Sequence, residues 1–257
     1  MQAVGILFAL VVATIGCSGA PAPTQLTILA ASSLSTSMAD LTTAWKQSHP
    51  QTNLVSSTGS SAALRTQIEQ GAPADVFLSA DTGNPQTLVE EGQAIRLTIF
   101  TTNSLVVIVP SANPATITSP ADLGRSGVCV IAAGVDVPIT TYAEKVAANL
   151  SSQPGYGSDF RARYEANVCS REDNVGAVVS KISLGEGDAA IVYATDAGAA
   201  TNVTTIPLPA AANVTATYGG VVVKASTDVF TASDFLTWLV GPDGQAVLAA
   251  HGFGAAP

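Results

Sequence analysis

Short apolar runs alternate with helical repeats along the N-terminal part of the chain. Residues 26–30 form a β-rich run that predicts a buried strand. Residues 35–47 then place Met38, Leu41 and Trp45 on one face of a predicted helix. The same order repeats, with strands predicted at residues 53–57 and 74–79 and helices at residues 60–70 and 87–91. This β-α-β-α-β-α order predicts a parallel sheet with crossover helices.

The alternation persists to the C-terminal end. Further strands are predicted at residues 104–110, 127–132, 189–193, 203–206 and 218–224, and further helices at residues 141–150, 160–165, 175–184, 233–240 and 244–251. The fold class is therefore α/β, and we expect two similar lobes.

The composition is that of a folded, acidic chain. Of its 257 residues, 47% are hydrophobic and 11% are charged, which excludes intrinsic disorder and allows one large domain or two modest ones. The net charge is −9, and no basic run occurs. Nucleic acid is not an expected partner, because proteins bind phosphate backbones through clustered Lys and Arg.

The N-terminal residues are typical of an export signal. Residues 3–15 form an apolar run shorter than the ~20 residues that a membrane-spanning helix needs. Gly16-Cys17 and a polar, Pro-rich stretch follow, as in bacterial lipoproteins. We predict a signal peptide at 1–16, a tether at 17–25 lipidated at Cys17, and an extracytoplasmic protein that meets the membrane only through this lipid. The alternative is an ordinary cleaved signal peptide with an incidental Cys.

Two further cysteines, Cys129 and Cys169, remain in the exported chain. An oxidising compartment and an even count favour a disulfide between them, and two buried, unpaired thiols are the alternative. Direct metal ligation is not expected, because His49 and His251 lie far from each other and from both cysteines in the sequence.

Pairs of serines stand at two strand-to-helix junctions, Ser32-Ser33 after the first strand and Ser60-Ser61 after the second. Helix N-capping is the simplest role for serine at such a junction. The same geometry also suits an anion, because a helix N-terminus offers unpaired N–H groups and a hydroxyl adds another donor. Two junctions at the carboxyl ends of adjacent parallel strands would face one crevice.

Enzymatic chemistry has little support in the sequence. No G-x-S-x-G motif or Gly-rich cofactor loop occurs, so no cofactor is expected. Neither histidine is placed to activate Ser33 or Ser61 as a nucleophile. Tyr193 ends an apolar run and is read most simply as a core aromatic residue with its hydroxyl at the surface.

Several stretches resemble the molybdate-binding ModA proteins. They are residues 26–38, 59–81, 103–110, 190–197 and 241–253, of which GAPADVFLSAD at 71–81 is the most specific. The resemblance implies a type II periplasmic-binding-protein fold, in which two α/β lobes close on a ligand like a hinge. The first lobe would comprise residues 26–104 and 217–257, and the second lobe residues 105–216.

Matched motif by motif, the resemblance implies an oxyanion site between the lobes. Its donors would be the hydroxyls of Ser33, Ser61 and Tyr193 and the backbone N–H groups of Ile139, in the loop leading to Tyr142, and Asn174. Ser32 or Ser60 could take its neighbour's role, and the Asn174 donor could lie one residue away. A Cys129–Cys169 bridge would fix the two donor-bearing segments of the second lobe.

The function implied by the resemblance is capture of molybdate, and of the similar tungstate, by a monomer that delivers it to an ABC-transporter permease. The ion would be held through its oxygens, without a Lys or Arg counter-ion. Three alternatives stay open: a site for another tetrahedral oxyanion such as sulfate, a serine-dependent hydrolase, and a structural surface lipoprotein.

Overall fold

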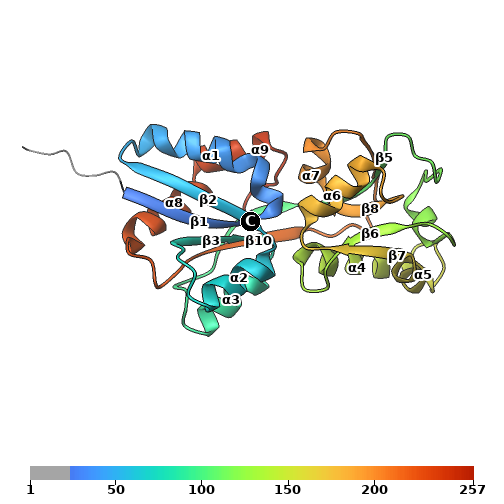
Figure 1. The fold of residues 1–257 in the computed structure, drawn as a ribbon, viewed down its shortest axis with the longest axis horizontal. Coiled ribbons are helices and arrows are strands. Elements are labelled where there is room, and N and C mark those ends of the chain that lie inside the picture. The colour runs from blue at the N-terminus through green and yellow to red at the C-terminus, as the bar shows by residue number, and fades with distance from the viewer. Residues whose placement is uncertain (1–23) are drawn as a thin grey trace, which may run out of the picture.

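The computed structural model describes residues 24–257, which form two groups of elements side by side (Figure 1). We refer to them as the first lobe, on the left of the figure, and the second lobe, on the right. Cys17 and the predicted signal peptide lie outside the described residues. Within residues 24–257, no helix has the length and apolar character required to cross a bilayer.

A five-stranded sheet with the order β2-β1-β3-β10-β4 forms the centre of the first lobe. Its strands are β1 (Thr24–Ala31), β2 (Thr52–Gly59), β3 (Val76–Ser79), β4 (Thr98–Asn103) and β10 (Ala216–Val222). Its helices are α1 (Ser35–Ser48), α2 (Ser61–Glu69), α3 (Gly83–Glu90), α8 (Val229–Val240) and α9 (Pro242–Ala250). In Figure 1, α1 and α9 lie on one side of the sheet, and α2 and α3 lie on the other.

The parallel sheet predicted from the alternation of elements is correct for β1, β2 and β3 and wrong for the rest of the sheet. β1 pairs in parallel with both β2 and β3, whereas β10 runs antiparallel to β3 and to β4. Since β10 arrives from the second lobe, it enters the sheet from the opposite end. The hydrophobic pattern does not predict β4, because its threonines lack the apolar character of the other strands.

The second lobe contains two smaller sheets. In one, β5 (Leu105–Pro110) lies between β8 (Ala190–Tyr193) and β9 (Val203–Pro207), and both pairs are antiparallel. In the other, β6 (Val130–Ala133) pairs in parallel with β7 (Val168–Glu172). The helices are α4 (Pro138–Ser151), α5 (Phe160–Ala166), α6 (Val175–Leu184) and α7 (Ala194–Ala199).

The chain passes between the lobes at two places. The first is Asn103–Leu105, between β4 and β5, and the second leads from β9 to the start of β10 at Ala216. On the basis of these connections, we propose that the first lobe comprises residues 26–104 and 217–257 and that the second lobe comprises residues 105–216.

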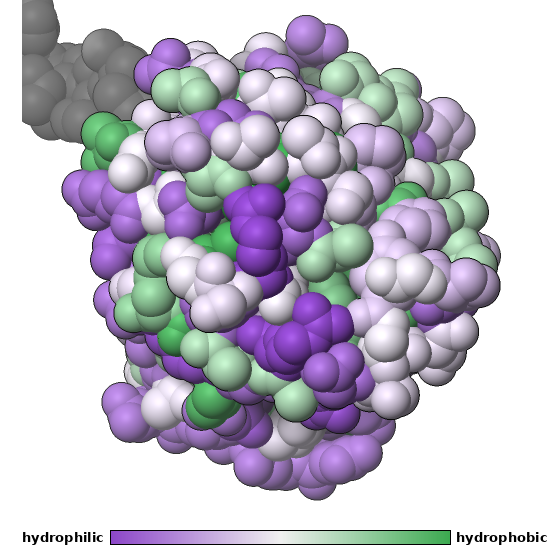
Figure 2. Space-filling model, turned by 90° about the vertical axis from the view of Figure 1, so that its right-hand side faces the viewer, coloured by the Kyte–Doolittle hydropathy of each residue, from purple (hydrophilic) through white to green (hydrophobic). Residues whose placement is uncertain are grey.

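The apolar positions predicted to face the core are buried. Leu26, Ile28, Leu41 and Trp45 have no exposed surface, so β1 and α1 bury the faces that their sequence periods indicate. On the end of the second lobe, strongly apolar residues appear only as separate spots among hydrophilic ones (Figure 2). That face therefore carries no broad apolar patch.

Helix α4 begins earlier than expected. The sequence predicts a loop at Ile139 and a helix from residue 141, but the helix starts at Pro138. Proline suits the first helical position, because its fixed φ matches the helix and its missing N–H would be unpaired there. Ile139 and Thr140 are β-branched and so have low helix propensity, but both lie in the first helical turn.

A disulfide joins Cys129 and Cys169, as predicted, with a Cα–Cα distance of 5.3 Å. Its position is explained by β7, a strand that the sequence analysis missed. Val130 pairs with Val168 at the start of the parallel β6–β7 pair, so the cysteines beside them are neighbours. The other ends of β6 and β7 lead to α4 and α6, where Ile139 and Asn174 lie.

We predict that replacing Cys129 and Cys169 by Ser lowers the free energy of unfolding by up to about 4 kcal/mol, because the bridge closes a loop of 40 residues and restricts the unfolded chain. Denaturant unfolding of both forms, each with Cys17 also replaced, measures the difference. Reducing agent should destabilise only the form that keeps the pair. Two alkylatable thiols in the unreduced, denatured chain would contradict the bridge.

Candidate functional site

A small cavity lies between the lobes. The first lobe contributes Ala31, Ser32, Ser33, Gly59, Ser60, Ser61 and Ala80, and the second lobe contributes Val137, Pro138, Ile139, Val175 and Tyr193. Four of the five predicted site residues therefore line one cavity. The fifth, Asn174, lines an adjoining, wider cleft that shares Ser60 and Val137 with the cavity.

Ser61 is the first residue of α2 and is 2% exposed. The backbone N–H of Ala80 donates to its Oγ over 3.1 Å, which leaves the Ser61 hydroxyl hydrogen available for another acceptor. Ser60 occupies the N-cap position of α2, yet its side chain makes no capping hydrogen bond. Capping, the simplest explanation for this serine pair, is therefore not what the side chains do.

Ser33 lies in a single 3-10 turn, η1 (Ser32–Leu34), between β1 and α1. Its side chain makes no capping hydrogen bond to α1 and is buried. Its Oγ lies 2.9 Å from the hydroxyl of Tyr218 on β10. The two residues are separated by 185 positions in the chain, so this pairing arises from the folded sheet alone.

Tyr193 presents an unpaired hydroxyl to the cavity. It is 1% exposed, and its hydroxyl has no hydrogen-bond partner among residues 24–257. The simplest sequence interpretation is wrong on this point, because the ring is in the core but the hydroxyl is not at the surface. Burial, with a smaller contribution from the neighbouring Tyr218, raises the pKa of Tyr193 well above its usual range. The hydroxyl therefore stays protonated and can donate.

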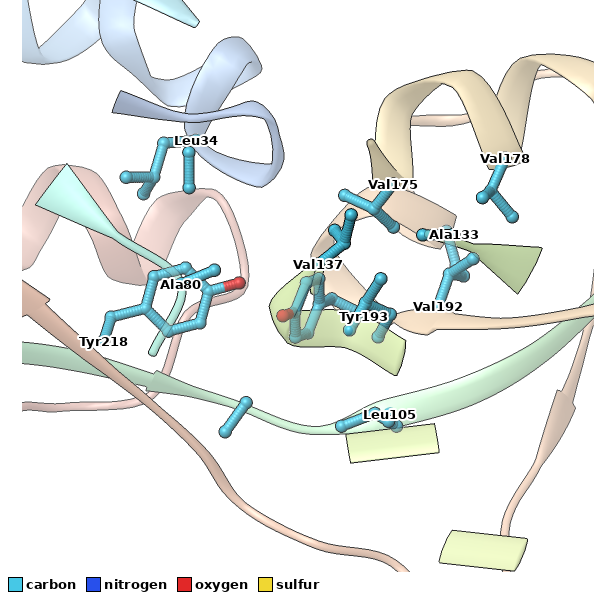
Figure 3. Packing of buried hydrophobic residues seen from close by; sticks show 14 of the residues in the cluster. Leu34, Ala80, Leu105, Ala133, Val137, Val175, Val178, Val192, Tyr193 and Tyr218 are labelled. Carbon is cyan, nitrogen blue, oxygen red and sulfur yellow. The ribbon is translucent and has the colours of Figure 1, made fainter. Parts of the chain in front are cut away.

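The hydroxyls of Tyr193 and Tyr218 both project into the space between the lobes (Figure 3). Tyr193 comes from the second lobe and Tyr218 from the first, with ring centroids 5.6 Å apart. A buried hydroxyl without a partner costs about 1–3 kcal/mol. The unpaired Tyr193 hydroxyl is thus the feature of this cavity that most needs a ligand.

Helix N-termini beside the cavity offer unpaired backbone N–H groups. Ile139 follows Pro138 in the first turn of α4, where N–H groups have no partner within the helix. Asn174 is the N-cap of α6, and its side chain accepts a hydrogen bond from Ala177 N–H over 3.1 Å. Helices α2, α4 and α6 all begin at or beside the cavity, so their positive dipole ends favour an anion there.

No Lys or Arg is among the residues that line the cavity. Arg65 and Arg171 line the adjoining cleft, where each is paired with a carboxylate, Glu69 and Glu165 respectively. Asp196, three residues after Tyr193, is a buried carboxyl near the site. Burial raises its pKa to about 7, so it carries only part of its negative charge near neutral pH. In the described part of the chain, no group of three or more His, Cys, Asp or Glu side chains is arranged to hold a metal ion.

Comparison with known proteins relates the chain to bacterial solute-binding proteins. The chain matches the family described as bacterial extracellular solute-binding protein over residues 26–254. The molybdate-binding protein ModA of Mycobacterium tuberculosis is 31% identical over 262 residues, covering 97% of this chain and 96% of that protein. The ModA protein of Escherichia coli is 30% identical over 239 residues, covering 89% and 88%.

Solved structures share the fold at lower identity. The periplasmic molybdate-binding protein of Azotobacter vinelandii superposes with a TM-score of 0.76 at 22% identity, covering 90% of this chain and all of that one. The sulfate-binding protein SubI of Mycobacterium tuberculosis superposes with a TM-score of 0.80 at 20% identity, covering 90% and 86%. The fold is that of two-lobed periplasmic binding proteins. By the extent of the family match and the identity to its relatives, the chain belongs to the bacterial extracellular solute-binding proteins and, among them, to the family of the molybdate-binding ModA proteins.

Proposed function

We propose that this protein captures molybdate outside the cytoplasm and delivers it to the permease of an ABC importer. Tungstate, which is similar to molybdate, would be captured in the same way. The observation that carries the proposal is the composition of the cavity. Ser33, Ser61 and Tyr193 contribute hydroxyls, helix N-termini from both lobes contribute N–H groups, and no basic side chain is present. Such a cavity suits a fully deprotonated tetrahedral dianion.

Neutral donors are sufficient to hold such an ion. Hydrogen bonds to a charged group contribute about 1.5–3 kcal/mol each, so five of them give roughly 7–15 kcal/mol before dehydration is subtracted. Micromolar affinity corresponds to about 8 kcal/mol net. An ion that carries a proton would need an acceptor in the cavity and is therefore disfavoured.

The positions of the histidines support a binding role without catalysis. His49 Nε2 lies 3.1 Å from Asp234, and His251 Nε2 lies 2.8 Å from Asp40. Neither histidine lines the cavity, so Ser33 and Ser61 have no general base beside them. We further propose that the protein is a monomer anchored through lipid on Cys17.

Sulfate is the second candidate ligand. Its charge and shape equal those of molybdate, and the sulfate-binding protein SubI shares this fold. Selection between the two ions then depends on size. In a cavity whose donors are spaced for the longer metal–oxygen bonds of molybdate, the smaller sulfate ion cannot reach every donor at once.

We predict that molybdate and tungstate bind one per chain and raise the melting temperature, whereas sulfate at the same concentration has little effect. A ligand at 100 times its Kd that binds only the folded state adds about 2.7 kcal/mol of stability. Calorimetric titration with molybdate, tungstate, sulfate and phosphate measures this. Equal affinity for sulfate and molybdate would contradict the molybdate assignment.

The serine pairs provide a matched comparison. We expect Ser33→Ala and Ser61→Ala each to weaken molybdate binding by on the order of 1.5–3 kcal/mol, because each removes one donor to a buried dianion. Ser32→Ala and Ser60→Ala serve as neighbouring controls and should change the Kd far less. If the controls prove to be the sensitive pair in titration, the donor assignment is displaced by one residue.

Tyr193→Phe should separate stability from binding. Because the hydroxyl has no partner in the described chain, its removal should leave the melting temperature of the free protein unchanged or raise it. The same change should weaken molybdate binding by about 1.5–3 kcal/mol. Thermal unfolding with and without molybdate reports both effects, and an unaltered Kd would remove Tyr193 from the site.

A further inference from the structure

A chain of buried hydrogen bonds connects the two lobe-joining strands to Ser33. Asn103, the last residue of β4, lies at the first connection between the lobes, and Tyr218 lies in β10 after the second. Asn103 Nδ2 is 3.4 Å from the Tyr218 hydroxyl, which is 2.9 Å from Ser33 Oγ. All three side chains are at most 4% exposed, so water does not compete for these groups.

The direction of this chain is set at Asn103. The backbone N–H of Ser104 can only donate, and it donates to Asn103 Oδ1 over 2.9 Å. The Asn103 nitrogen must therefore face the other way, where it donates to Thr195 Oγ1 over 2.9 Å and to the Tyr218 hydroxyl. With its oxygen accepting from Asn103, Tyr218 has its own hydrogen free for Ser33 Oγ.

We propose that Asn103 and Tyr218 are positioning residues that form a one-way relay, in which Asn103 donates to Tyr218, Tyr218 donates to Ser33, and the Ser33 hydrogen is thereby turned toward the bound oxyanion. The relay rests on the proposed function, because it ends at Ser33, which is one of the proposed donors to the oxyanion. The relay gives a functional role to Asn103 and Tyr218, neither of which lines the cavity.

The relay has two physical effects. It fills the acceptor side of the Ser33 oxygen, so the hydroxyl does not rotate to donate into the protein. Successive hydrogen bonds in a buried chain also polarise one another, which strengthens the last donor. The Asn103 amide also donates to Thr195, which lies two residues after Tyr193. One amide group therefore contacts Tyr218, which is bonded to Ser33 of the first lobe, and Thr195, which lies near Tyr193 of the second lobe.

A different proton arrangement makes a different prediction. If the Tyr218 oxygen accepted from both Asn103 and Ser33, its hydrogen could point to the anion directly. Tyr218 would then be a ligand in its own right, independent of Ser33. A double-mutant cycle separates these arrangements, because a relay acts only through Ser33 whereas a direct ligand does not.

The experiment compares the wild-type chain with Tyr218→Phe, Ser33→Ala and the double variant, titrated calorimetrically with the oxyanion that the wild type binds most tightly in the four-ion panel. Phenylalanine keeps the ring that packs on Phe100 and Phe253 and removes only the hydroxyl. The relay predicts that Tyr218→Phe raises the Kd about 3- to 10-fold in the wild-type background and less than about 2-fold in the Ser33→Ala background. Tyr164→Phe, a buried tyrosine of the second lobe outside the cavity, is the control and should leave the Kd unchanged.

Three results overturn the relay. An unchanged Kd for Tyr218→Phe, with a lower melting temperature, would give Tyr218 a purely structural role. An equal loss of affinity in both backgrounds would make Tyr218 a direct ligand. If no oxyanion in the panel binds the wild-type chain, the proposed function fails first and the relay with it, so the two failures are distinguishable.

Discussion

The requirement that hydroxyl hydrogens be left free governs the construction of this cavity. A buried hydroxyl ordinarily gives its hydrogen to the nearest carbonyl, which would turn it away from a ligand. Here the Ser61 oxygen is engaged by the Ala80 N–H, and the Tyr193 hydroxyl is kept apart from every described acceptor. Hydroxyl hydrogens that folding would normally pair with a protein acceptor therefore stay unpaired, and the surrounding sheets and helix N-termini keep them so.

This arrangement reconciles an acidic protein with the anionic ligand proposed for it. A net charge of −9 sets the field at long range, but salt screens that field within about 10 Å. Inside the cavity the relevant charges are the partial ones at the starts of α2, α4 and α6, which act over one helical turn. The net charge of the whole protein therefore says little about the ion that it is proposed to bind. The helix dipoles decide at short range, and their positive ends lie at the cavity.

Most residues of the candidate site are predictable from the sequence because they follow local rules. Ser33, Ser61 and Asn174 stand at strand-to-helix junctions, and Tyr193 ends a buried strand. Tyr218 and Asn103 were missed because their contacts join distant parts of the chain: 185 positions separate Ser33 from Tyr218 and 115 separate Asn103 from Tyr218, and no local spacing encodes such contacts. For the same reason the antiparallel entry of β10 was missed: an apolar run predicts a strand but not its direction. Strands β4 and β7 are polar and edge-like, and only pairing with a neighbour defines them.

Neither lobe alone contains the complete set of donors, since the cavity takes its walls from both. The free energy gained from an ion is then realised in full only when the two walls stand at a fixed separation. By linkage, occupancy and the spacing of the lobes are coupled, so each shifts the equilibrium of the other. A second protein that touches only the outer rims, at a distance from the ion, could thus measure the concentration of the solute through geometry alone.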